Sequence, residues 1–400
     1  MNALHSILFF LSGLTFVYLS VNAVYLLVNA AGGRLIPTMT FPVHRDKKMI
    51  AVLIPCYKED LVILDSVMHL KEHNYPKDRF SITVIADKLQ SATISKLRQI
   101  PVGVIEVDLS MKSRSLNAGL KAIRESGADI IMILDADNIL GFDCLEKINA
   151  AFHAGCKAVQ CHRTAKNRNT SVAWLDAMSE EININLFRRG PDRLGLSAAP
   201  IGSGMAFDPD LITEIFSSAE IQQNPGEDRE IDLQLMRRKI KMHFIDDALV
   251  YDEKVSNAGV FERQRVRWLE AQLNHVKRFF HGDMISAPKT FLYFNKILQT
   301  LLLPRILTVA AFGVFLILLV AQSAFGSHLL FPSAVAWIVL MIVYLFSLII
   351  SIPADYFQLK TLLAFGQVPL LMLAMVRALM QMKRKRTEFL HTPKSFNAES

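Results

Sequence analysis

Long apolar segments lie near both ends of the chain, and a charged region separates them. Arg34 is the first Lys, Arg, Asp or Glu, and residues 306–354 contain none of these four residue types. A helix of about 20 apolar residues is long enough to cross a bilayer. The pattern therefore predicts an N-terminal transmembrane anchor (1–33), a central domain (45–280) and a C-terminal membrane region (305–382).

The N-terminal apolar segment fits either an anchor or a cleaved signal peptide. Val28-Asn29-Ala30 resembles a small-residue cleavage site. The apolar stretch is longer than the core of a signal peptide, and no basic residues precede it, which favours an anchor. Basic residues follow it directly, and the positive-inside rule then places the central domain in the cytoplasm, at the cell (inner) membrane. They are Arg34, Arg45, Lys47 and Lys48.

The C-terminal region predicts two membrane spans, at 306–321 and 329–352, and a third, ambiguous segment at 361–376. A basic tail (383–400) follows. Three C-terminal crossings would place this tail outside, against the positive-inside rule, so the third segment is expected to be interfacial or re-entrant. Residues 285–304 mix apolar and polar positions beside the bilayer and predict an interfacial helix region.

Short apolar runs in the central region each stop at a polar residue. Met49–Pro55, Ile82–Ala86 and Ile130–Leu134 are separated by helix-like segments. Such runs are typical of a mostly parallel sheet covered on both faces, whose ligands bind beyond the carboxyl ends of the strands. The pattern predicts an α/β fold. The polar residues expected at that edge are Lys58, Glu59, Asp87, Asp135 and Asp137.

Composition and charge narrow the class of protein. The chain of 400 residues is 52% hydrophobic, too apolar for an ordinary soluble domain, yet 20% charged, too charged for an all-membrane transporter. The net charge is +7, but the basic residues flank membrane segments, so anionic lipids are a simpler partner than nucleic acid. The sequence contains neither the GxxxxGK[ST] loop of P-loop proteins nor the GxGxxG fingerprint of dinucleotide-binding proteins, so it supports neither class.

Asp135 and Asp137 form an Asp-Ala-Asp pair directly after an apolar strand. This spacing at a strand end can turn two carboxylates toward one point. Carboxylate oxygens suit Mg²⁺ or Mn²⁺, and such an ion would neutralise a diphosphate leaving group. A loop cap is the alternative interpretation of the same pair.

Two further motifs have a structural and a functional interpretation. Lys112 opens a helix-like stretch, and a lysine at a helix N-terminus can hold an anionic group, although a capped surface helix explains the same residues. Gly204, in Gly202-Ser203-Gly204, would let backbone approach a sugar closely, whereas a plain turn is the alternative.

Glu227 and Asp228 head a segment that can be helical. Carboxylates are favoured in a first helical turn, so a structural cap is one interpretation. The other makes Asp228 a general base that takes a proton from an acceptor hydroxyl.

Gln264, Arg267 and Trp268 are spaced i, i+3 and i+4, which places them on one face of a helix. Arg267 would contact a pyrophosphate, and the indole of Trp268 offers a platform for a sugar ring. An amphipathic helix on the membrane, with Trp268 as an interface anchor, explains the same spacing.

Taken in order, these motifs resemble the membrane-bound, processive family 2 glycosyltransferases, which have the nucleotide-sugar GT-A fold. The resemblance covers about residues 48–275 and extends to Phe389–Lys394, and the chain is similar to synthases of cellulose, hyaluronan and poly-N-acetylglucosamine. It implies donor contacts from Pro55, Tyr57, Glu59, Asp87, Lys112, Asp135 and Asp137, and a metal at Asp135 and Asp137. It also implies catalysis by Asp228 beside Glu227, and acceptor or pyrophosphate contacts from Gly204, Gln264, Arg267 and Trp268.

The chain departs from the family pattern at two places. Gly226 stands where threonine is usual, and Ala86-Asp87-Lys88 lacks a second acidic residue common there. The C-terminal membrane region is also short for a synthase that threads its own polymer, so a homo-oligomer or a secretion partner is expected.

The resulting hypothesis is an inverting, metal-dependent transfer of a hexose or N-acetylhexosamine from a UDP-sugar to a growing polysaccharide at the cytoplasmic membrane face. The alternative is a single transfer to a membrane lipid, such as a polyprenyl phosphate or glycolipid. A third hypothesis is a non-catalytic membrane subunit of a glycan secretion complex.

Overall fold

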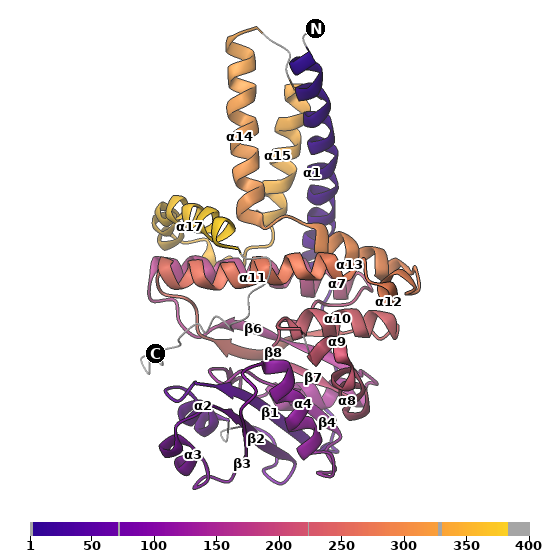
Figure 1. Cartoon of the computed structure of the whole chain (residues 1–400), viewed down its shortest axis with the longest axis vertical. Helices are drawn as coiled ribbons and strands as arrows, with labels where there is room; N and C mark the ends of the chain where they lie inside the picture. Colours follow the sequence, from indigo (N-terminus) through magenta and orange to yellow (C-terminus); the bar gives the residue numbers. More distant parts are fainter. Residues whose placement is uncertain (1–2, 71–72, 223, 327–329, 383–400) are drawn as a thin grey trace.

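The computed structural model describes residues 3–70, 73–222, 224–326 and 330–382. An α/β domain forms one end of the molecule, and a bundle of α1, α14 and α15 projects from it (Figure 1). Their bounds are Ala3–Leu35, Arg305–Ala324 and Ala334–Ile349. The predicted basic tail and the motif at Phe389–Lys394 lie outside the described residues.

The centre of the α/β domain is an eight-stranded sheet in the order β3-β2-β1-β4-β7-β6-β8-β5. Neighbours from β3 to β4 are parallel, as are β6 and β8, whereas β7 is antiparallel to both its neighbours and β5 to β8. This confirms the predicted α/β fold with a mostly parallel sheet. The strands are β1 Ile50–Tyr57, β2 Phe80–Asp87, β3 Gly103–Val107, β4 Ile130–Ile133, β5 Ile139–Leu140, β6 Ala158–Ala165, β7 Met205–Phe207 and β8 His243–Asp252.

Alternate residues of the central strands enter two separate apolar cores, as the pleat requires. Val52 and Ile54 of β1 pack on one face of the sheet, and Leu53 packs on the other. The first core also contains residues of α2 (Ile63–His69) and α5 (Cys144–His153). The second core contains residues of α4 (Lys112–Ala122), α8 (Pro209–Ser217), α9 (Ala219–Gln222) and α10 (Glu227–Arg237). Both faces are covered, which explains the continuous apolar runs.

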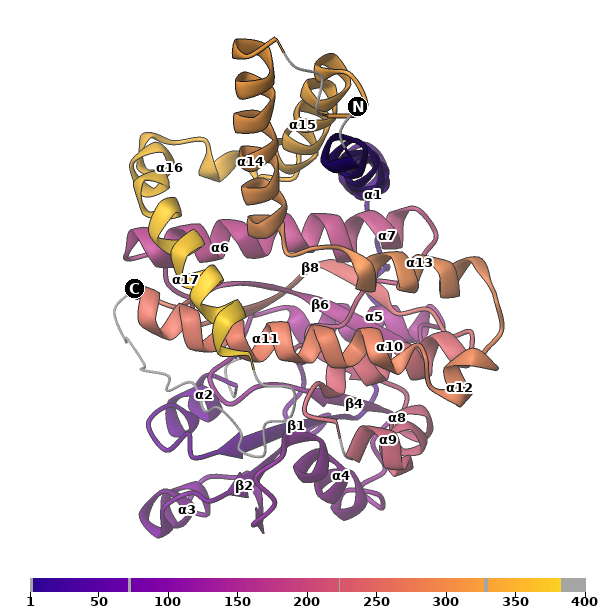
Figure 2. The same ribbon diagram turned by 45° about the horizontal axis from the view of Figure 1, so that its top comes forward.

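The register of the strands gathers their polar carboxyl ends at one edge. Tyr57 of β1 lies opposite Asp87 of β2, and Leu53 lies opposite Ile133, the last residue of β4. Asp135 therefore follows its strand at the level where β1 continues toward Tyr57. The helix α3 (Ser91–Leu97), which connects β2 to β3 in the chain, lies beside β2 (Figure 2).

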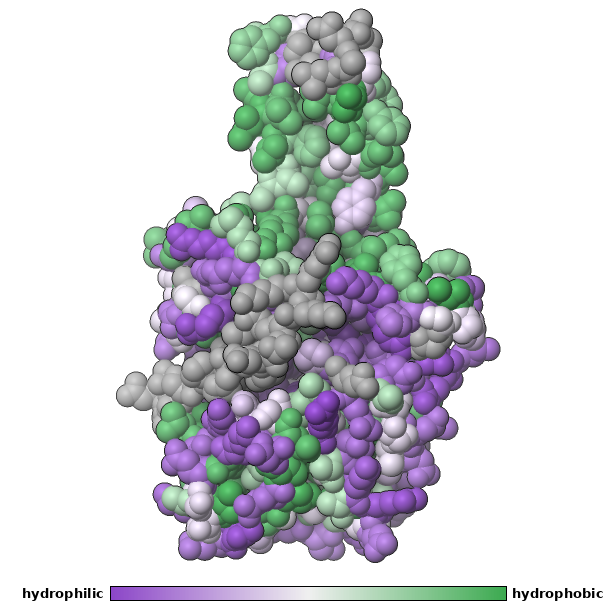
Figure 3. Space-filling view, viewed as in Figure 1, coloured by the Kyte–Doolittle hydropathy of each residue, from purple (hydrophilic) through white to green (hydrophobic). Residues whose placement is uncertain are grey.

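Three helices of the described chain are long and apolar enough to cross a membrane: His5–Leu35, Arg305–Ala324 and Leu359–Gln381. The bundle of α1, α14 and α15 presents an apolar surface (Figure 3). The second predicted C-terminal span is shorter than expected, because α15 has 16 residues, which at 1.5 Å per residue measures about 24 Å. Its predicted N-terminal part is instead a turn around Pro332 and Ser333.

The ambiguous third segment is broken into pieces. Its elements are α16 (Leu359–Ala364), a 3₁₀ turn (Phe365–Gln367) and α17 (Val368–Gln381), after a 3₁₀ turn at Ala354–Tyr356. Figures 1 and 2 show α17 beside α11 (Ala258–Arg278) and crosswise to the bundle. The interfacial or re-entrant placement of this segment stays a prediction.

The helix α1, predicted to be an anchor, is bonded directly to the α/β domain. α6 (Ser171–Ile184) continues into a π-helical turn (Asn185–Arg189) and α7 (Gly190–Arg193), which contact α1. The Asn185 amide donates to the Ala30 carbonyl (3.2 Å) and to the Ser351 hydroxyl (3.0 Å). Further along the chain, α12 (Gly282–Ile285) and α13 (Phe291–Leu301) lead into α14. The position of the anchor is therefore coupled to α6.

We expect Gly190→Ala to destabilise this junction. An added Cβ would lie 2.1 Å from the Asn29 carbonyl oxygen and 2.8 Å from that of Asn185, and both are backbone atoms that cannot yield alone. Overpacking of this kind costs about 1–3 kcal/mol. Thermal unfolding in detergent should show a clear fall in Tm, while Gly313→Ala, where nothing lies within 4 Å of the new Cβ, should leave Tm nearly unchanged. Equal Tm values for the two variants would contradict this account of the junction.

A buried ion cluster connects α6 to β6 and β8. His162 Nε2 lies 3.1 Å from a Glu181 oxygen, and its Nδ1 lies 3.3 Å from an Asp246 oxygen. Arg189 also binds Asp246, at 2.6 Å. Burial favours the neutral imidazole, but the hydrogen bonds and charges of the two carboxylates outweigh it and raise the pKa of His162 to about 9.

We expect this cluster to make stability depend on pH. The folded-state pKa lies above the unfolded value of about 6.5, so the stabilisation is complete below that pH and is lost as pH rises through about 9. It amounts to on the order of 3 kcal/mol. Unfolding measured between pH 6.5 and 9.5 should show a fall in Tm that His162→Gln, already less stable at pH 6.5, lacks. A parallel fall in both proteins would exclude His162 as its source.

Candidate active site

A single cavity of about 780 Å³ holds most of the residues that the sequence predicts. It lies between the carboxyl edge of the sheet, α6, α10, α11 and the start of α14. The predicted residues that line it are Pro55, Tyr57, Glu59, Lys112, Asp135, Asp137, Glu227, Asp228, Gln264, Arg267 and Trp268. Segments more than 200 residues apart in the sequence thus form one wall.

Asp87 lies behind the cavity wall instead of on it. Its carboxylate accepts hydrogen bonds from the N–H groups of Ser110 (2.7 Å) and Leu109 (3.3 Å) and from the Ser115 hydroxyl (3.1 Å). These bonds hold the loop that leads into α4. In this structure, Asp87 therefore orients the start of α4, where Lys112 lies.

The structure gives Gly204 a packing role, and its predicted acceptor contact stays a prediction. Gly204 has a φ of +65°, and an added Cβ would lie 2.9 Å from Val250 Cγ2, so the glycine allows close packing on β8. It does not line the cavity. Gly202, with a φ of +92°, lines it instead, and its carbonyl accepts a hydrogen bond of 2.8 Å from Lys112.

Lys112 joins three separate segments at the cavity floor. Its ammonium group lies 2.7 Å from Asp135 Oδ1 and 2.9 Å from Glu227 Oε1. Burial favours the neutral amine, but the two carboxylates outweigh it and raise the pKa of Lys112 above its usual range. The lysine is therefore a permanent cation beside both acidic motifs.

The two carboxylates at the start of α10 differ in their surroundings. Glu227 is buried, which raises its pKa, while the nearby Lys112 opposes that rise. Asp228 lines the cavity, and its Oδ1 accepts the Arg229 N–H at 2.8 Å. Of the two carboxylates, Glu227 is therefore the one that pairs with Lys112.

The sequence did not predict a series of hydrogen bonds that lies behind Asp135. The Asp135 N–H donates to the Ser203 hydroxyl (2.9 Å), which donates to Asn138 (2.5 Å), whose amide donates to Asp252 (3.0 Å). These hydrogen bonds fix the turn after β4 against β8. Only Asn138, directly after the Asp pair, offered a signal in the sequence.

Asp135 and Asp137 fit a hard divalent cation. Both line the cavity at the end of β4, and carboxylate oxygens are the ligands that Mg²⁺ and Mn²⁺ prefer. Within the described ranges no cluster of three or more His, Cys, Asp or Glu side chains could hold a metal. Mg²⁺ in proteins often binds through one or two carboxylates, with phosphate and water completing its shell, which suits this pair.

One face of α11 lines the cavity beyond the predicted motif. Gln264, Arg267 and Trp268 lie on this face, and Gln272 and His275 continue it. Burial and neighbouring cations lower the pKa of His275 to about 3, so its imidazole is neutral. The indole of Trp268 is 36% exposed, as a stacking platform requires. The spacing of Gln264, Arg267 and Trp268 predicted which face of α11 lines the cavity, but not that this face extends to His275.

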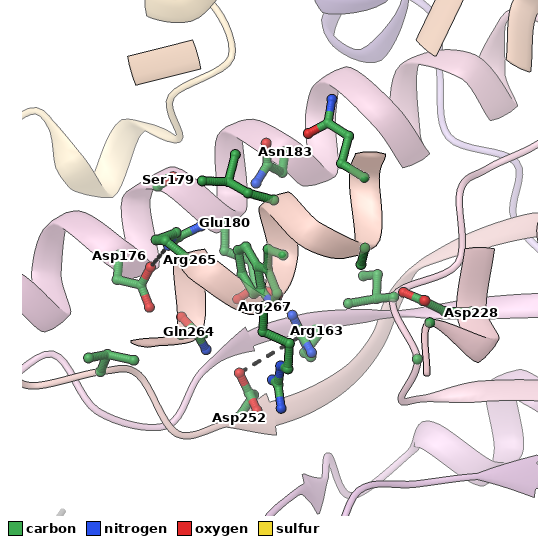
Figure 4. A pocket seen from close by; sticks show the side chains of 18 of the residues that line it. Arg163, Asp176, Ser179, Glu180, Asn183, Asp228, Asp252, Gln264, Arg265 and Arg267 are labelled. Atoms are coloured by element: carbon green, nitrogen blue, oxygen red, sulfur yellow. Dashed lines mark hydrogen bonds and ion pairs between the residues drawn. The ribbon is translucent and has the colours of Figure 1, made fainter. Parts of the chain in front are cut away.

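The wall formed by α6 was not predicted (Figure 4). Arg163 binds Glu180 at 2.6 Å, and Arg265 binds Asp176 at 2.7 Å while its guanidinium lies 4.1 Å from the Trp268 ring centroid. These pairs fasten α6 to β6 and α11. The sequence of α6 has no motif spacing that would mark it as a cavity wall, so only the contacts reveal it.

Comparison with known proteins agrees with this site. The family described as "Glycosyltransferase like family 2" matches residues 47–271. A probable glycosyltransferase, YdaM, of Bacillus subtilis is 23% identical over 58% of this chain and 56% of its own length. An N-acetylglucosaminyltransferase of Rhizobium meliloti is 20% identical over 74% of this chain and 68% of its own length.

A solved structure has the same fold. The mannosyltransferase PcManGT of Pyrobaculum calidifontis, in complex with GDP-Man and Mn²⁺, is 18% identical, with a TM-score of 0.56 over 91% of this chain and 98% of that one. The shared architecture is the GT-A fold. Since the matching family covers more than half of the chain, this protein is a member of glycosyltransferase family 2.

Proposed function

We propose that this enzyme transfers a hexose or N-acetylhexosamine from a UDP-sugar, with inversion and with a divalent metal, to a growing glycan at the cytoplasmic membrane face. The observation that carries this proposal is the common cavity of Asp228, Lys112 and the Asp135–Asp137 pair. The relatives named N-acetylglucosaminyltransferase support the class of sugar. The three apolar helices support membrane association.

In the proposed reaction, Asp228 accepts the proton of an acceptor hydroxyl. The hydroxyl oxygen attacks the anomeric carbon as the bond from that carbon to the diphosphate breaks, and UDP leaves with the bonding electrons. Attack from the face opposite UDP converts an α-linked donor into a β-linked product. Lys112 and Arg267 lie in the cavity as cations for the diphosphate.

The remaining predicted residues bind and orient the donor. Pro55, Tyr57 and Glu59 line the cavity at the end of β1, where base and ribose would lie. Asp135 and Asp137 would hold Mg²⁺ or Mn²⁺, which when bound neutralises charge on the departing diphosphate. Trp268 would stack on the acceptor sugar.

A second acceptor class is favoured by one observation. The cavity continues from Asp228 to apolar side chains of the membrane-proximal helices, including Leu303, Phe365 and Leu371. A single transfer to a membrane lipid would use this end of the cavity. The length of the product distinguishes the two, because a polymerising enzyme yields a ladder of glycans and a single transfer yields one product.

We expect Asp228→Asn to reduce turnover about 10²–10⁴-fold, the usual contribution of a general base. The amide keeps the shape but cannot accept the proton. Release of UDP by the purified protein in nanodiscs, measured with a panel of UDP-sugars, gives the rate. Asp210→Asn is the matched control, since Asp210 is exposed on α8 and lies outside the cavity. Unchanged turnover in Asp228→Asn would refute its assignment as the base.

We expect metal binding and activity to depend together on Asp137. Chelation with EDTA should stop UDP release, and Mn²⁺ or Mg²⁺ should restore it. Asp137→Asn should weaken Mn²⁺ binding about tenfold or more, because an amide oxygen replaces a charged ligand. Electron paramagnetic resonance of Mn²⁺ measures this without turnover. Asp143 is an exposed residue at the start of α5, so Asp143→Asn should bind Mn²⁺ like the wild type. If Asp137→Asn also bound Mn²⁺ like the wild type, the metal would not bind at Asp137.

A further inference from the structure

The cavity has a second end with a different chemistry. Away from the carboxylates of the sheet edge, the lining changes to Leu303, just before α14, and to the first residues of α14, the charged Arg305 and the apolar Ile306. On α17 and the turn before it the lining is apolar. These residues are Phe365, Val368, Leu371 and Met375. Apolar side chains beside membrane helices suit a hydrocarbon chain.

Arg305 is a cation at this apolar end of the cavity. Its guanidinium donates to the Ser179 hydroxyl (2.7 Å) and to the Ser179 carbonyl (2.8 Å). Within the described residues no carboxylate lies within ion-pair distance of Arg305, whereas Lys112 binds two carboxylates and Arg265 binds one. The described part of the chain therefore gives Arg305 no direct ion pair.

A cation among apolar groups is costly unless an anion pairs with it. The guanidinium offers a planar fork of donors that matches phosphate oxygens, and the Ser179 hydroxyl adds a donor next to it. Serine alone occupies only part of this fork. Arg305 thus has donors left for an anionic ligand that enters the cavity.

We propose that Arg305 and Ser179 bind the phosphate group of a membrane lipid whose hydrocarbon chain lies against Leu303, Phe365 and Leu371. The inference rests on the proposed function and names the acceptor class: a lipid phosphate or diphosphate that already carries at least one sugar. A hydroxyl of that sugar reaches Asp228 in the same cavity and attacks the donor. The phosphate of the lipid fixes how far the acceptor enters.

The test uses the full-length chain in a nonionic detergent with soluble probes. Farnesyl phosphate carries both the chain and the phosphate, farnesol carries only the chain, and inorganic phosphate only the anion. Dissociation constants come from isothermal titration calorimetry. Wild-type protein should bind farnesyl phosphate at least tenfold more tightly than farnesol or inorganic phosphate, as a charge-assisted bond predicts.

The variants separate the site from general charge attraction. Arg305→Gln should bring the affinity for farnesyl phosphate down to that for farnesol, a loss of about tenfold or more. Arg377→Gln is the matched control, because Arg377 is an exposed arginine on α17 outside the cavity lining. It should bind farnesyl phosphate like the wild type. If Arg305→Gln does not fold, Ser179→Ala should weaken farnesyl phosphate binding severalfold and leave farnesol binding unchanged.

Three results would overturn the inference. Equal affinity of the wild type for farnesyl phosphate and farnesol would show a purely apolar site, and equal affinity for inorganic phosphate would show a site for free phosphate. An equal effect of Arg305→Gln and Arg377→Gln would show general attraction. These binding measurements need no donor and no turnover. The lipid-phosphate site can therefore be refuted while the loss of UDP release in Asp228→Asn still supports the proposed function, and the proposed function can be refuted while the lipid-phosphate site is supported.

Discussion

The bridge from Lys112 to Asp135 and Glu227 is the interaction on which the site depends. It joins the start of α4, the end of β4 and the first turn of α10, with bonds of 2.7 and 2.9 Å. Buried carboxylates are tolerated only when they are paired. Without the lysine, the carboxylates of Asp135 and Glu227 would repel each other or bind protons. Lys112 forms an ion pair with Glu227, whereas the neighbouring Asp228 lines the cavity without an ion pair to this lysine. Lys112 also lies where a diphosphate would need positive charge.

The helix α6 gives the membrane region and the active site a shared wall. Its inner face lines the cavity through Ser179 and Glu180, and its continuation contacts α1 through Asn185. Several ion pairs bind it to the sheet, so it behaves as part of the α/β domain. The cavity wall nearest the apolar bundle is therefore fixed relative to Asp135, Asp137 and Asp228.

The cavity combines two environments that a glycosyltransferase at a membrane needs. One end, at the carboxyl edge of the sheet, concentrates acidic and basic groups that suit a nucleotide diphosphate and its metal. The other end is mostly apolar and contains Arg305 beside Ser179. An ordinary soluble acceptor would gain nothing from that apolar end, whereas an amphipathic acceptor would be held by both parts. The change in chemistry along one cavity thus gives a direction to the bound acceptor.

The sequence by itself determined the strands, their polar ends and the order of motifs, because local periodicity and charge fix which residues are buried in each segment. It therefore predicted Asp135, Asp137, Asp228 and the face of α11. Tertiary structure alone decided which glycine approaches the site, Gly202 in place of Gly204, and it moved Asp87 behind the wall. It alone also revealed that α6 lines the cavity and that hydrogen bonds connect Ser203 to Asp252 through Asn138. It alone showed that Arg305 has no carboxylate at ion-pair distance among the described residues. Those features arise from contacts between distant segments, and no local pattern encodes which segments meet.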